Sequence, residues 1–394
     1  MGVDKRLLAE RIGGLLFITS TAALNTFANT SPQATTELGQ IRSVAGTQYW
    51  VEIPGQPSRY EAQQAASVVL SGLATERREL RGVVILGDYA TMPSRRLVSS
   101  NPELLGDLVG FFANPEADRD RWWVWNDDFY GDIDGDGLAE VPVSRVPIIP
   151  TRGGVCGLGA GKSSPAHTSA GIRAREFAFA DDVYTTSLGK QNPADMASVP
   201  PKGLVPPSFA AKLWSGPFTS ADFSATYLYL VLHGDNGTAL SYHGSEQQGW
   251  GTLAVNRDVV GRAEVVFGAV CWGALMTVTT AELEDAKHPC ARTVDQSLAL
   301  CFLDEGASAY IGFTASHYIP DGEKSRHDST LLGAPLHRMF WDNIIDFDLA
   351  PAEALHRARL QFILEATQKA KGPDLLSAEA MKTYWSATCL GFGW

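Results

Sequence analysis

Two stretches of the sequence decide the fold: Tyr227-Leu-Tyr-Leu-Val-Leu232-His233-Gly234-Asp235 and Ala263-Glu-Val-Val-Phe-Gly-Ala-Val270-Cys271-Trp272-Gly273. Each is a short apolar run that ends in a chemically capable residue next to a glycine. Such runs are typical of strands buried on both faces, as in the centre of a parallel α/β sheet. The residues between them suffice for a crossover connection, so we expect the two strands to lie side by side and parallel.

The ends of these runs carry the candidate chemistry. Parallel neighbours end at one edge of the sheet, so His233 and Cys271 are expected to meet there. An imidazole beside a thiol makes an activated nucleophile, because it takes the thiol proton. The backbone N–H groups of Gly234 and Cys271 are candidate oxyanion donors. Taken singly, a strand-end histidine or a small buried cysteine is more often a packing residue; the paired placement favours catalysis.

Several upstream motifs make the sequence resemble a known family. An apolar block with His-Gly, followed by an apolar block with Ala-Cys, is similar to the clan of caspases, legumains, clostripain and gingipains; here Val270 is inserted between Ala269 and Cys271. The gingipain-like branch, peptidase family C25, fits best. The motifs that carry this are Leu86-Gly87-Asp88 followed by Pro93, Asp127-Asp-Phe-Tyr-Gly-Asp132, Asp134-Gly-Asp-Gly137, and Ser144-Arg145-Val-Pro147 with Ser144 in place of glycine.

The resemblance implies a caspase/gingipain-like three-layer α-β-α fold with mostly parallel sheets and two packed subdomains. It also implies a cysteine endopeptidase with a carboxylate that orients the histidine from well upstream, for which Glu176 is the candidate. Asp235 and Trp272 are candidates for the substrate pocket. Asp235 and the acidic balance favour a basic residue before the cut. His243-Gly244 competes with His233, but it follows a polar turn rather than a clean strand.

The order of elements agrees with an α/β fold in a chain of 394 residues. Strands are expected at 15–19, 48–53, 82–86 and 307–314, and helices at 34–44, 61–73, 336–345 and 351–369, an alternation typical of βαβ units. We divide the chain into an N-terminal α/β subdomain (1–150), a connector and helical region (151–224), with a helix at 170–184, and a catalytic α/β subdomain (225–394). The final strand is left open, because the C-terminus departs from the family's usual ending.

An aspartate-rich loop is a candidate metal site. Alternating carboxylates with glycines in a tight loop suit a hard cation such as calcium, and the candidate ligands are Asp132, Asp134, Asp136 and Glu140. The loop is not an EF-hand, since Val143 stands where the bidentate glutamate belongs, and Asp/Gly loops are also ordinary turns. We expect no cofactor for the chemistry and leave a structural Ca²⁺ open.

Composition limits the kinds of partner that the protein could bind and indicates where in the cell it works. The net charge of −12 argues against nucleic acid, which requires a basic surface, and no segment is long enough to cross a membrane. Five cysteines without CxxC spacing favour a reducing, cytoplasmic location. The alternative is secretion, if residues 1–28 are a signal peptide.

The function expected from all this is a cysteine endopeptidase that cleaves a protein or peptide substrate through Cys271 and His233. Regulation by an activating partner is consistent with this class. The alternative is a catalytically degenerate or metal-dependent protein-binding module on the same scaffold.

Overall fold

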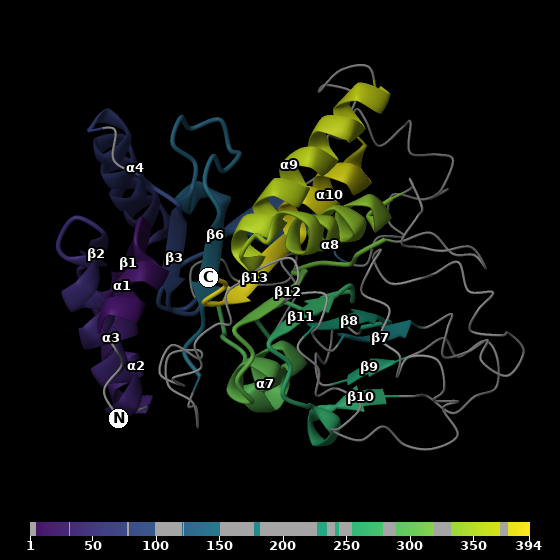
Figure 1. The fold of residues 1–394 in the computed structure, drawn as a ribbon, viewed down its shortest axis with the longest axis horizontal. Coiled ribbons are helices and arrows are strands. Elements are labelled where there is room, and N and C mark those ends of the chain that lie inside the picture. Colours follow the sequence, from purple (N-terminus) through teal and green to yellow (C-terminus); the bar gives the residue numbers. More distant parts are fainter. Residues whose placement is uncertain are drawn as a thin grey trace, which may run out of the picture.

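The computed structural model describes residues 5–30, 32–76, 79–98, 120, 122–149, 177–181, 227–234, 241–243, 254–278, 289–318, 332–370 and 377–394. Its centre is a nine-stranded sheet (Figure 1). The strands follow one another across the sheet in the order β2 (Trp50–Ile53), β1 (Leu15–Ser20), β3 (Gly82–Leu86), β6 (Val143–Val146), β13 (Ala387–Gly391), β12 (Ala309–Phe313), β11 (Val265–Gly268), β8 (Tyr227–Val231) and β7 (Phe177–Asp181).

The sheet is mostly parallel. Strands β2, β1, β3 and β6 pair in parallel, and so do β12, β11, β8 and β7. Strand β13 pairs antiparallel with β12 and meets β6 through the single register pair Leu390 and Arg145. The C-terminal strand, which the sequence left open, therefore joins the strands of the two halves of the chain into one sheet.

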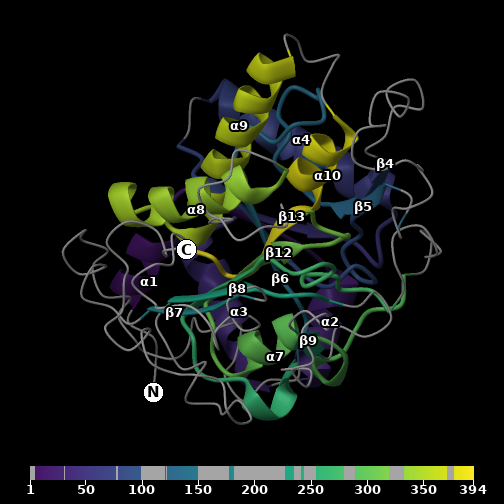
Figure 2. The same ribbon diagram turned by 90° about the vertical axis from the view of Figure 1, so that its right-hand side faces the viewer.

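Helices cover both faces of this sheet and form the outer layers. They are α1 (Lys5–Ile12), α2 (Thr21–Thr30), α3 (Pro32–Ala45), α4 (Arg59–Thr75), α7 (Leu298–Asp304), α8 (Ala334–Phe347), α9 (Pro351–Ala370) and α10 (Ala378–Ser386). Figure 2 shows α7 below the sheet, with α8 and α9 above it. The predicted α/β class with three layers and a mostly parallel sheet is confirmed.

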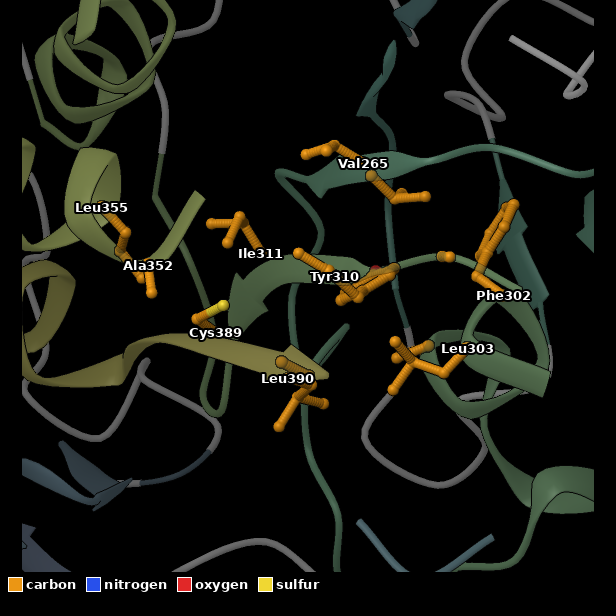
Figure 3. Close-up of a cluster of buried hydrophobic side chains, with 14 of the residues drawn as sticks. Val265, Phe302, Leu303, Tyr310, Ile311, Ala352, Leu355, Cys389 and Leu390 are labelled. Carbon is orange, nitrogen blue, oxygen red and sulfur yellow. The ribbon is translucent and has the colours of Figure 1, made fainter. Parts of the chain in front are cut away.

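Alternation along the strands explains the layers. In β1, Leu15 and Phe17 belong to one buried cluster, while Leu16 and Ile18 belong to the cluster that includes α4. In β12, Figure 3 shows Ile311 on the side of Ala352 and Leu355 of α9, and Tyr310 on the side of Phe302 and Leu303 of α7. Successive side chains of a strand point to opposite faces, so apolar runs of this kind must be covered twice.

One predicted element is wrong. The helix expected over 170–184 is replaced at Phe177–Asp181 by strand β7, which pairs in parallel with β8. The sequence Phe177-Ala-Phe-Ala180 alternates large and small residues with period two, which suits a strand. The predicted boundaries at 150 and 224 fall on residues outside the described ranges, so the division into subdomains stays a prediction.

Two further observations concern membrane-spanning segments and the N-terminal strand. Among the described residues, no helix is both long and apolar enough to cross a membrane. Strand β1 is buried along its whole length between β2 and β3, so removal of residues 1–28 would delete a central strand.

Candidate active site

The two chemically capable residues leave neighbouring strands at the same level. The last register pair between β8 and β11 joins Leu230 to Gly268, and Ala269 N–H donates to Leu230 O at 2.7 Å. His233 and Cys271 each follow three residues beyond that pair. The parallel neighbours therefore bring both residues to the carboxyl edge of the sheet, as predicted.

Gly234 brings the two chain segments into direct contact. A Cβ at this position would collide with the carbonyl oxygen of Cys271 and would lie 2.7 Å from a methyl carbon of Val270. Only a glycine lets the backbone after His233 approach the backbone of Cys271 so closely. The glycine of the His-Gly motif is thus required by packing as well as offering an N–H.

The sulfur of Cys271 is half-buried on the backbone of His317, beyond the end of β12. His317 N–H donates to Sγ at 3.3 Å, and the thiol donates to His317 O at 3.4 Å. A backbone N–H at the sulfur can stabilise negative charge on it. His233, in contrast, is exposed.

His317 itself is unsuited to act as the base. Its ring stacks on Phe313 with centroids 3.5 Å apart, and its Nε2 lies 2.7 Å from Nε2 of His337, whose Nδ1 lies 2.8 Å from the Tyr229 hydroxyl. Burial, and then the charge of Lys382, lower the pKa of His317 to about 3. An imidazole with so low a pKa is a weak base and takes the thiol proton poorly. The accessible His233 is the better candidate.

The Cys271 turn is supported from below. Trp272 is 2% exposed and adopts a left-handed backbone with φ of 55°. Its N–H donates to Ala315 O, and its indole Nε1 donates to Asp120 Oδ2, both at 2.9 Å. The structure therefore places Trp272 inside the protein beneath the nucleophile, and not in an open pocket.

The remaining predicted positions are placed as follows. Asp235 and Glu176 lie outside the described residues. His243 ends β9 (Ser241–His243), which pairs with β10 (Ala254–Asn256) in a separate two-stranded sheet. Tyr242 of β9 is buried, and its hydroxyl donates to Gly273 O at 3.1 Å, so this hairpin packs next to the Cys271 turn.

The aspartate-rich loop forms the cluster that its sequence predicts. Ligand atoms of Asp132, Asp134, Asp136 and Glu140 all lie within 4.8 Å of one another. Gly135 and Gly137 take left-handed backbones and donate N–H groups to Asp132. Burial first, and the charges of Asp134 and Asp132 as well, raise the pKa of Glu140.

This loop lies away from the Cys271 turn. Val83 N–H, at the start of β3, donates to Pro142 O just after the loop. The starts of β3 and β12 share an edge, because Arg81 lies over the Trp394 ring and Gly393 N–H donates to Ser308 O. Cys271 follows the end of β11, which is parallel to β12. Loop and turn are therefore at opposite edges of the sheet.

Sequence reasoning missed three residues of this site. His317 comes from a turn-rich segment. Asp120 comes from a segment rich in arginine and aspartate, and Lys382 from a helix near the C-terminus. Nothing in their local pattern marks them, since charged runs are usually solvated surface. Only the packing of three distant segments around Trp272 brings them together.

Comparison with known proteins supports the fold. No family model matches the chain, and no curated protein matches it in sequence. It is similar to a solved structure described as "Structure of Protease", with 10% identity, 96% of this chain and 77% of that chain covered, and a TM-score of 0.52. The chain therefore shares its overall fold with that structure.

Two further solved structures align over similar lengths with lower scores. One is described as "Crystal structure of the Arg specific cysteine proteinase gingipain R (RGPB)", with 11% identity, 99% and 78% of the two chains covered, and a TM-score of 0.46. The other is "Complex of Porphyromonas gingivalis RgpB pro- and mature domains", with 11% identity, 96% and 78% covered, and a TM-score of 0.44.

Proposed function

We propose that this chain is a gingipain-like cysteine endopeptidase with Cys271 as nucleophile and His233 as general base and acid. The observation that carries the proposal is the register of β8 and β11, whose last pair, Leu230 and Gly268, stands three residues before His233 and Cys271 respectively. The contact of Gly234 with the Cys271 carbonyl supports it. The protease fold is consistent with it.

The proposed chemistry follows from these groups. His233 takes the thiol proton, and the thiolate attacks the scissile carbonyl to form a tetrahedral intermediate. The N–H groups of Gly234 and Cys271 are the proposed donors to its oxyanion. His233 then protonates the leaving amine, and water hydrolyses the thioester. The N–H of His317 offers the thiolate a hydrogen bond before attack.

The substrate and setting are part of the same proposal. A preference for a basic residue before the cut rests on Asp235, two residues after His233 in the sequence, and on the net charge of −12. Control by an activating partner rests on the class of enzyme alone. A cytoplasmic location is part of the proposal and rests on the five cysteines without CxxC spacing.

A peptide-library digestion tests the function. Wild-type protein, Cys271→Ala and Cys290→Ala would each be incubated with a mixed peptide library, and the cut sites read by mass spectrometry. Cys290 is exposed and serves as the matched control. We expect cuts after Lys or Arg that vanish in Cys271→Ala and persist in Cys290→Ala. Cuts that persist in Cys271→Ala would sink the proposal, and an intact library with wild type would favour the binding-module alternative.

We also propose that the aspartate-rich loop binds Ca²⁺ as a structural ion. Four carboxylates within 4.8 Å offer the oxygen ligands that this ion prefers. The like charges that help to raise the pKa of Glu140 would be neutralised by a cation. Because the loop lies at the edge opposite Cys271, the ion would stabilise the fold and take no part in the chemistry.

Calcium titration checks this expectation. At about 1 mM Ca²⁺, within the range of weak protein sites, the midpoint of thermal unfolding should rise, and EDTA should reverse the rise. Asp134→Asn and Asp136→Asn should remove the response, whereas Asp346→Asn, at an exposed aspartate on α8, should keep it. An unchanged midpoint in wild type would argue against a bound ion.

A further inference from the structure

A buried carboxylate lies beneath the candidate nucleophile. Asp120 is 1% exposed. Its Oδ2 accepts from Trp272 Nε1 at 2.9 Å and from Ser316 N–H at 2.8 Å. Its Oδ1 accepts from Ser316 Oγ at 2.7 Å and from Lys382 Nζ at 2.6 Å. One carboxylate thus joins three segments that are remote in sequence.

Two of these segments hold the sulfur between them. Trp272 directly follows Cys271, and Ser316 directly precedes His317, whose backbone N–H and O lie 3.3 and 3.4 Å from Sγ. A shift of either segment would move the sulfur relative to its backbone partner. Asp120 therefore fixes the segments on both sides of the nucleophile.

The Cys271 turn needs such support. A left-handed backbone is unfavourable at a residue other than glycine, because Cβ comes too close to the carbonyl oxygen, and Trp272 has a φ of 55°. Strain of this kind persists only where the surroundings determine it. The hydrogen bonds of Trp272 to Ala315 and Asp120 hold the backbone in this conformation.

Lys382 offsets the cost of burying the Asp120 carboxylate. It is 1% exposed, and its ammonium also donates to Ser316 Oγ and lies 5.3 and 5.4 Å from the ring centroids of Trp122 and Tyr318. A buried carboxylate without a cation is strongly unfavourable. Lys382 supplies the opposite charge at 2.6 Å from Asp120, and hydrogen bonds in which one partner is ionised are stronger than neutral ones.

We propose that Asp120 is a positioning residue that sets the reactivity of Cys271, with Lys382 as its counter-ion. The proposal rests on the proposed function, in which Cys271 is the nucleophile. It assigns Asp120, Ser316, Lys382 and the Trp272 indole to the machinery of the site.

Two variants test the proposal at different strengths. Asp120→Asn removes the charge, and Trp272→Phe keeps an aromatic ring but loses only the indole N–H. Three quantities would be measured for each: the rate at which iodoacetamide alkylates Cys271, read by peptide mass mapping; kcat and KM on a cleaved peptide; and the midpoint of thermal unfolding. Cys290 in the same digest is the internal control for alkylation.

We expect alkylation of Cys271 and kcat to fall on the order of 10- to 100-fold in Asp120→Asn, and less in Trp272→Phe, as for loss of hydrogen bonds to a charged group. KM and the alkylation of Cys290 should stay within about twofold, because the peptide-binding surface is not displaced. Wild-type alkylation of Cys271 in folded Asp120→Asn would overturn the proposal. If that variant does not fold, Trp272→Phe decides by the same criterion. Alkylation needs no peptidase activity, so an inactive wild-type protein would refute the proposed function and leave this test intact.

Discussion

A His233→Asn variant is expected to lose peptidase activity by about 10²- to 10⁴-fold in kcat, the usual contribution of a general base. The expectation rests on the register of β8 and β11, which places His233 and Cys271 at one level of the sheet edge. His233 is exposed, so the substitution should leave the unfolding midpoint unchanged. Single-turnover cleavage of a fluorogenic peptide would measure the loss.

His243→Asn is the matched control. His243 also precedes a glycine but belongs to the β9–β10 hairpin, outside the central sheet. We expect it to retain activity within a few-fold of wild type. The reverse pattern, with His243→Asn inactive and His233→Asn active, would transfer the role of the base to His243 and show that strand-end placement misleads here.

An Arg145→Met variant is expected to lose about 3–5 kcal/mol of unfolding free energy, the cost of removing one partner of a buried ion pair. Arg145 is fully buried and donates to both carboxylate oxygens of Asp127, at 2.7 and 2.6 Å. It also donates to the carbonyl oxygens of Gly87 and Met92. The substitution would leave Asp127 and two carbonyl groups without their partner, and urea unfolding would measure the loss.

The control is an ion pair at the surface. Arg42 lies 3.1 Å from Glu52, but its side chain is 58% exposed. Arg42→Met should cost no more than about 1 kcal/mol, because water screens and replaces such a pair. Equal losses in the two variants would mean that burial does not set the strength of the Arg145 contacts.

The contacts of Arg145 also explain some of the motifs in which the sequence resembles gingipain-like peptidases. The two aspartates of Asp127-Asp-Phe-Tyr-Gly-Asp132 pair with different buried arginines, Arg145 of β6 and Arg359 of α9. The Tyr130 hydroxyl donates to Pro93 O, beyond the Gly87-Asp88 pair. We infer that these motifs hold the framework together, while the chemistry depends on the His-Gly and Cys turns.

Much of the fold could be predicted because the sequence pattern of each strand or helix lies within the element itself. Glycine-bounded apolar runs gave β1, β3, β8, β11 and β12 at nearly their observed limits. The helix predicted over 170–184 was wrong at 177–181, where the residues form the edge strand β7. Pairing with β8 overrides local preference there, since strand stability depends on the neighbouring strand.

By itself, the sequence determined that two apolar strands would end in a histidine and a cysteine, and that parallel pairing would bring them to one edge. The tertiary structure decided what surrounds the thiol: the backbone of His317, the strained turn at Trp272, and the Asp120–Lys382 pair below it. The physical reason is the distance along the sequence over which each interaction acts. Strand and turn preferences act within a few residues, whereas a buried carboxylate finds its partners only when segments 150 to 260 residues apart close around it.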